Sequence, residues 1–169
     1  MTVRTVNGYP PNPPEYERVA KSNFSEWRLS IGGLVETPLQ LSLADLRAFP
    51  KRTQITKHHC IQGWSAVGQW TGVPLSDLLE RCRPRAEVRY LVFTGFDERE
   101  GRVYYETIDL ELARHPQTIL AYEMNGAPLP IEHGAPCRRL RIETQLGFKM
   151  VKYLRSIEFV EDYQHLGDG

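Results

Sequence analysis

The residue best suited to chemistry in this sequence is Cys60, which ends a predicted strand, residues 54–60, where a loop begins. His58 and His59 precede it, and Gly63 follows soon after. On a strand, His58 and Cys60 share one face and His59 takes the other. A thiolate in this position could be a soft metal ligand or a nucleophile. The simpler interpretation is a buried structural cysteine beside two ordinary histidines, and the spacing matches no zinc signature.

A second candidate is the basic segment 133–155, which carries six basic residues against one acidic residue. Glycine lets backbone amides approach an anion, and an arginine fork binds phosphate oxygens in a bidentate manner. Lys149 and Lys152 are spaced i, i+3, which puts both ammonium groups on one side if the stretch is helical. Charge alone is typical of a solvated surface. The glycine, proline and histidine among these bases favour a site for a small, dense phosphate.

Short strands must position both candidates, because they outnumber the helices that the sequence predicts. Ser42 is a predicted helix cap, and Asn125-Gly126 is the strongest hairpin signal. Strict β-α-β alternation is absent, so the predicted fold class is α+β with mixed, largely antiparallel sheets. The strands are predicted at residues 27–31, 39–41, 54–60, 89–94, 103–107, 118–122, 139–143 and 156–160, and the helices at 43–48, 74–82 and 109–114. Residues 8–14 are rich in proline, which predicts that residues 1–22 form an extended arm of a single domain, residues 1–169.

Composition limits the classes of function. The 21 basic and 21 acidic residues balance, which argues against a general nucleic-acid binder. No apolar run approaches the roughly 20 residues of a membrane span, and the first residues do not resemble a signal peptide. We therefore expect a cytoplasmic protein, or a periplasmic one if the chain is a fragment. Three cysteines are too few for a disulfide framework, and we expect Cys82 and Cys137 to be structural.

Five ordered segments of the sequence together resemble the molybdopterin-binding domain of the sulfite oxidase family. They are residues 60–65, 70–75, 121–130, 133–136 and 147–153. Five motifs in order are far more specific than any one of them, and the resemblance extends over residues 7–162, nearly the whole chain. It implies the sulfite-oxidase-type mixed α+β fold. It also implies a mononuclear molybdenum held by one pyranopterin dithiolene, without a nucleotide.

By this resemblance the family's metal-ligating cysteine is Cys60, the catalytic residue, whose soft thiolate suits an oxo-molybdenum centre. The basic segment would anchor the terminal phosphate of the pterin. Either Arg138 or Arg139 could be the phosphate ligand, because the stretch between Pro136 and Gly147 is one residue longer than is usual in the family. Similarly, Gly95 could take the place of Thr94 in the strand near the metal. The residues implied to bind the cofactor are Asn7, Gly8, His58, Cys60, Thr94, His133, Arg138, Arg139, Gly147, Phe148, Lys149 and Lys152.

The resemblance implies an oxidoreductase that moves an oxygen atom to or from a small substrate, sulfite-like or sulfoxide-like, with two electrons. Residues 61–65 lack the basic residue that sulfite oxidases have after the cysteine, and they look more like a bacterial branch with methionine sulfoxide reductase catalytic subunits. A haem protein or other one-electron carrier is the implied partner. The family's dimerisation domain is missing, which favours a monomer.

Two other classes of function stay open. A cofactor-free thiol enzyme would use Cys60 with His58 or His59 as its base, but it leaves the basic segment unexplained. A non-catalytic binding module would have kept the fold and lost the cofactor. The presence of Cys60, Gly63 and Gly147 is weak evidence against such a loss. Four aromatic residues could line a substrate pocket, although aromatic residues at such spacing are more often core. They are Trp64, Trp70, Phe96 and Tyr105. The sequence specifies neither the substrate nor the direction of the reaction.

Overall fold

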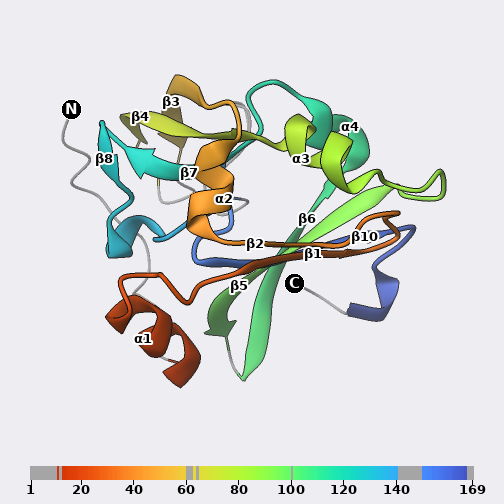
Figure 1. Cartoon of the computed structure of the whole chain (residues 1–169), viewed down its shortest axis with the longest axis horizontal. Helices are drawn as coiled ribbons and strands as arrows, with labels where there is room; N and C mark the ends of the chain where they lie inside the picture. Colours follow the sequence, from red (N-terminus) through yellow and green to blue (C-terminus); the bar gives the residue numbers. More distant parts are fainter. Residues whose placement is uncertain are drawn as a thin grey trace.

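The chain folds into two β-sheets with short helices around them (Figure 1). The computed structural model describes residues 11, 13–59, 63, 65–99, 101–140 and 150–166, and of residues 99, 139 and 140 it describes the backbone alone. Among these residues no helix is long and apolar enough to cross a membrane. The domain boundaries 1–169 stay a prediction.

The first sheet has the strand order β2-β1-β10-β5-β6. Among the described strands only the β1–β10 pair is parallel and the other pairs of both sheets are antiparallel, which agrees with the predicted mixed, largely antiparallel sheets. The strands are β1 (Leu29–Gly33), β2 (Leu39–Leu41), β5 (Tyr90–Arg99), β6 (Arg102–Asp109) and β10 (Leu154–Val160). The strand β10, which comes latest in the sequence among those described, therefore lies in the middle of this sheet.

The second sheet has the order β3-β4-β7-β8, and β9 also pairs with β7. Its strands are β3 (Arg52–His59), β4 (Ser65–Pro74), β7 (Ile119–Met124), β8 (Ala127–Pro128) and β9 (Arg138–Leu140). Asn125 and Gly126 take positive φ angles of 53° and 80°, which confirms the predicted tight hairpin between β7 and β8. The buried side chains form a large core and a smaller cluster on the second sheet, made of Trp70, Ile119, Ala121, Met124, Leu129 and Met150.

The short helices follow local signals in the sequence. They are α1 (Pro14–Lys21), α2 (Leu43–Ala48), α3 (Leu75–Cys82) and α4 (Leu110–Arg114), with the 3-10 turns η1 (Ile131–His133), which ends where the basic segment begins, and η3 (Gln164–Leu166). Ser42 and Asp45 form a capping box at the start of α2. In Figure 1, α2 lies between the two sheets, and it contacts both β2 and β4.

Two expectations about the elements need correction. The extended arm predicted to residue 22 is wrong from Pro14 onward, because α1 starts there. Proline fits the first turn of a helix, and Tyr16 and Val19, spaced i, i+3, are buried on its inner face. The sequence also failed to predict β4. Glycine is depleted in strands, yet Gly72 is needed because a Cβ there would lie 2.0 Å from the carbonyl oxygen of Leu120.

Candidate anion-binding site

The structure brings several of the predicted site residues together beside the second sheet, close enough for their charges to interact. His58 comes from β3, His133 from η1, Arg138 from β9, and Lys152 from the segment before β10. Arg139 follows in β9, but its side chain is not described. Six of the predicted residues, Asn7, Gly8, Cys60, Gly147, Phe148 and Lys149, lie outside the described residues.

Arg138 is the most unusual of these side chains, because it is a cation that is only 2% exposed. Its Nη1 donates to the carbonyl oxygen of His133 at 3.0 Å, and its Cζ lies 4.9 Å from the centre of the Trp70 ring. Its Nε and Nη2 are buried and have no hydrogen-bond partner among the described residues. These two N–H groups form one edge of the guanidinium, the edge that grips an anion with two parallel hydrogen bonds.

Arg138 is held without a neutralising carboxylate in the part of the chain that the structure describes. Burial therefore lowers its pKa from 12.5 to about 10, although the hydroxyl of Tyr153 acts in the opposite direction. A buried charge and two buried donors without partners both cost free energy. An anion at the Nε–Nη2 edge would remove both costs.

Burial and the same excess of positive charge also lower the pKa values of two neighbouring basic residues, Lys152 and His58. Burial and then Arg138 lower the pKa of Lys152 to about 8, while Asp97 and Glu132 oppose the change. The Lys152 Nζ donates to the carbonyl oxygen of Glu132 at 3.0 Å. Burial, followed by the charges of Arg138, Lys152, His133 and His59, lowers the pKa of His58 to about 4. The strands β3 and β9, the turn η1 and the segment before β10 thus place basic side chains around a region that favours negative charge.

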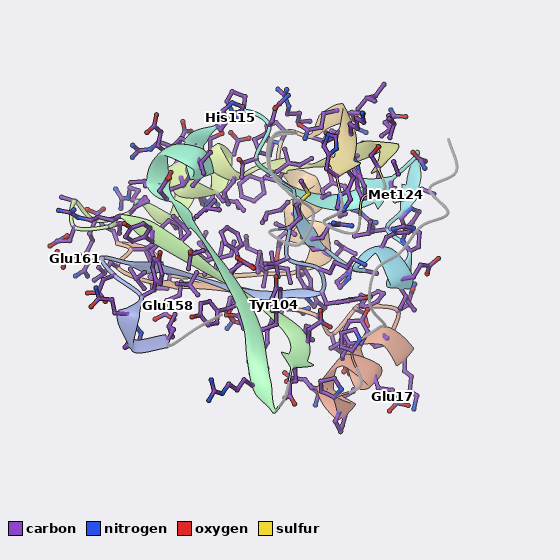
Figure 2. All side chains as sticks on the ribbon, turned by 180° about the vertical axis from the view of Figure 1, so that it is seen from behind. Glu17, Tyr104, His115, Met124, Glu158 and Glu161 are labelled. Atoms are coloured by element: carbon purple, nitrogen blue, oxygen red, sulfur yellow. The ribbon has the colours of Figure 1, made fainter. Side chains whose placement is uncertain are left out.

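The acidic residues near the end of the chain do not supply that negative charge. Figure 2 shows Glu158 and Glu161 on the opposite side of the molecule from Met124, a member of the small cluster that also contains Trp70. Because Trp70 lies against Arg138, the site and these acids are far apart. The zero net charge of the whole chain therefore conceals a local excess of positive charge.

The loop 133–138 is fixed tightly against the segment that carries Lys152. Gly134 has a φ of 107°, and a Cβ there would lie 2.9 Å from the Cβ of Lys152. The amide of Tyr153 donates to Gly134 at 3.2 Å, and that of Leu154 donates to Cys137 at 2.9 Å. The hydroxyl of Tyr16 in α1 donates to the carbonyl oxygen of Ala135 at 2.9 Å. The loop is therefore positioned by contacts from both ends of the chain.

The structure also shows the surroundings of several other residues that the sequence analysis named. Residues 150–153 are not helical, so the i, i+3 argument for Lys149 and Lys152 does not apply. Thr94 is half-buried and pairs with Ser156, whereas a Cβ on Gly95 would lie 2.8 Å from the carbonyl oxygen of Lys152. Cys82 and Cys137 are buried free thiols, and burial raises the pKa of both, which agrees with structural roles.

Metal ligation by Cys60 stays a prediction, since that residue lies outside the described ranges. Within those ranges no three His, Cys, Asp or Glu side chains are grouped so as to hold a metal. Trp70 and Phe96 are core residues, as the simpler interpretation expected. Tyr105 is half-buried, and Trp64 lies outside the described residues. Nothing in the sequence indicated that Trp70 also contacts Arg138, because that contact joins strands far apart in the chain.

Known proteins are similar to this chain in sequence and fold. A family model described as the oxidoreductase molybdopterin binding domain matches residues 16–166. A putative protein-methionine-sulfoxide reductase subunit of Azospira oryzae is 35% identical over 147 residues, which are 87% of this chain and 54% of that protein. The protein-methionine-sulfoxide reductase catalytic subunit of Xanthomonas axonopodis pv. citri is 36% identical over 149 residues, covering 82% of this chain and 46% of that protein.

A solved structure agrees with these matches. The sulfane dehydrogenase SoxCD of Paracoccus pantotrophus superposes with a TM-score of 0.74 at 28% sequence identity, over 82% of this chain and 39% of that one. The chain spans about half the length of the curated relatives that it matches. Its two sheets and few short helices are those of the sulfite oxidase-type fold, as the five motifs indicated. The chain belongs to the oxidoreductase molybdopterin-binding domain family.

Proposed function

We propose that this domain holds a molybdenum–molybdopterin cofactor without a nucleotide and serves an oxidoreductase that reduces a sulfoxide. The observation that carries the proposal is Arg138, a buried cation with two donors that have no partner among the described residues. A terminal phosphate offers the paired oxygens and the negative charge that this edge lacks. The donor set at the site therefore fits the cofactor of the family.

Each of the described site residues has a role in this proposal. Arg138 would grip the phosphate through Nε and Nη2, and Lys152 would supply a second positive charge. Gly134 would keep the loop close to Lys152, so that both cations face one ligand. When bound, the cofactor supplies a molybdenum centre that exchanges an oxygen atom and two electrons with the substrate. The surrounding core excludes water and strengthens each charged contact.

Cys60 would supply the thiolate ligand to the metal. It follows directly on His59, the last residue of β3, and β3 carries His58 toward the cluster of bases. The strand β3 is paired along its whole length with β4, which holds His59 in place. A cofactor held at two points requires rigid elements that carry its ligands.

The names of the relatives support a sulfoxide as the substrate, since two of them are called protein-methionine-sulfoxide reductases. The reaction consumes two electrons and two protons and releases a thioether and water. A haem protein or another one-electron carrier would deliver these electrons one at a time, two for each sulfoxide.

The experiment compares Arg138→Gln with Arg155→Gln, in protein made by a host that synthesises molybdopterin. Arg155 is a matched control, because it lies nearby but is exposed and pairs with Glu15 at 3.3 Å. Loss of two charge-assisted hydrogen bonds should weaken cofactor binding by about 100-fold or more. We expect Arg138→Gln to lose most of its molybdenum and pterin, measured per mole of protein, while Arg155→Gln keeps both. Full occupancy in Arg138→Gln would refute the assignment.

Turnover tests the remaining part of the proposal. Wild-type protein should reduce methionine sulfoxide with a reduced dye as electron donor. Cys60→Ser should retain pterin but lose turnover, and unchanged turnover would contradict the ligand assignment. Arg139→Gln, measured alongside, decides between the two arginines that the sequence left as alternatives.

A further inference from the structure

Trp70 has a buried donor that the fold itself does not use. The side chain is 3% exposed, and its Nε1 has no hydrogen-bond partner in the described part of the chain. A buried N–H of this kind ordinarily finds a partner, because leaving it unpaired costs about 1–3 kcal/mol. Trp27 shows the usual arrangement, since it is fully buried and its Nε1 donates to the carbonyl oxygen of Leu154 at 2.9 Å.

The indole of Trp70 lies along β4 toward the site. Gly68 shares its face of the strand, and a Cβ on Gly68 would lie 3.1 Å from Nε1 and 3.2 Å from Cε2 of the indole. Gly68 pairs with Thr56, and Ala66, the next residue on this face, pairs with His58. The N–H edge of the indole is therefore the edge nearer to His58 and the cluster of bases. Glycine at position 68 is what lets the ring lie in this direction.

The guanidinium of Arg138 lies over the face of the same ring. The guanidinium Cζ lies 4.9 Å from the ring centre, which is a cation–π distance. Among the described residues Arg138 has one hydrogen bond, at Nη1, so a second contact is needed to fix the plane of the group. The ring face supplies that contact. Three buried N–H groups without partners among the described residues thus belong to two side chains in contact, Arg138 and Trp70.

We propose that Trp70 completes the anion site: its ring fixes the plane of the Arg138 guanidinium, and its indole N–H donates to the anion that Arg138 binds. The inference rests on the proposed function, which places an anion at Arg138. It assigns Trp70 two separate tasks, stacking and donation, and substitutions can separate them.

The donation is tested by NMR on the full chain, ¹⁵N-labelled and prepared without cofactor. Three tryptophans give three indole N–H signals, assigned by substitution. On titration with inorganic phosphate, the Trp70 signal should move, and the Trp27 signal should stay in place because its N–H is already bonded. The movement should vanish in Arg138→Gln and persist in Arg155→Gln. A Trp70 signal that does not respond in the wild-type protein overturns the donation, whether or not phosphate binds.

The stacking is tested by phosphate affinity, measured by calorimetry on two variants. Trp70→Phe keeps a ring under Arg138 and loses the N–H, and we expect about five- to tenfold weaker binding. Trp70→Leu loses both, and we expect binding to weaken further. An unshifted Trp27 signal shows that each variant is folded. Equal affinities of the Phe and Leu variants overturn the stacking, and a Phe variant that binds like wild type overturns the donation.

Failure of this inference and failure of the proposed function are distinguishable. If Trp70 does not respond to phosphate, but Arg138→Gln loses molybdenum in the loaded protein, the inference falls and the proposed function stands. If Arg138→Gln keeps its full molybdenum content, the proposed anion site falls, and the role of Trp70 falls with it.

Discussion

Replacing Arg138 with methionine tests whether this buried charge serves a ligand or the fold. The lowering of its pKa from 12.5 to about 10 corresponds to about 3 kcal/mol by which burial disfavours the charged form relative to water, although the group stays charged at neutral pH. The hydrogen bond to His133 and the contact with Trp70 together return about 2–4 kcal/mol. Methionine fills similar space without a charge. We therefore expect the free energy of unfolding of cofactor-free protein to change by no more than about 1 kcal/mol.

The assay is urea denaturation of both proteins in phosphate-free buffer, followed by circular dichroism. Leu46→Ala is the control for sensitivity, because Leu46 is fully buried and its truncation should cost about 2–5 kcal/mol. Added phosphate should stabilise the wild-type protein in proportion to the logarithm of its concentration, and should leave the methionine variant unchanged. A loss of about 3 kcal/mol or more in Arg138→Met would refute the reasoning, since that is the cost of breaking a buried structural ion pair.

Three further predictions concern the loop, the lysine and a helix cap. Gly134→Ala should weaken phosphate binding and lower stability, because residue 134 has a φ of 107° and a Cβ there would meet Lys152. Gly126→Ala is the control: a Cβ at that position faces open space, so the substitution should lower stability alone. Equal phosphate affinities in the two variants would contradict this prediction. Since the pKa of Lys152 is about 8 and a bound anion favours the charged form, phosphate affinity should fall as the pH rises above 8, and Lys152→Arg should remove the fall. Ser42→Ala breaks the capping box of α2 and should cost about 1 kcal/mol in urea denaturation without changing phosphate affinity; an unchanged stability would show that the cap contributes nothing.

Elements with a local cause were predicted from the sequence. The helix Leu43–Ala48 begins after a serine that caps it and ends before Pro50, and the structure has the same limits. The hairpin at Asn125-Gly126 is equally local, because both residues tolerate positive φ. In these places the information lies within a few residues, so no knowledge of the rest of the chain is needed.

The parts that were missed depend on distant contacts. The strand β4 has glycine where the backbone of β7 approaches closely, and only the sheet explains that choice. The sequence could not choose between Arg138 and Arg139, because neighbouring residues of a strand face opposite ways and the direction depends on the pairing of β9 with β7. The contact of Trp70 with Arg138 was invisible for the same reason.

The position of β10 ties the anion site to the middle of the first sheet. This strand lies between β1 and β5. The amides of Tyr153 and Leu154, just at its start, hold the loop that carries Arg138. The placement of Arg138 and Lys152 therefore depends on the pairing of the first sheet, and we expect the site and that sheet to open as one cooperative unit.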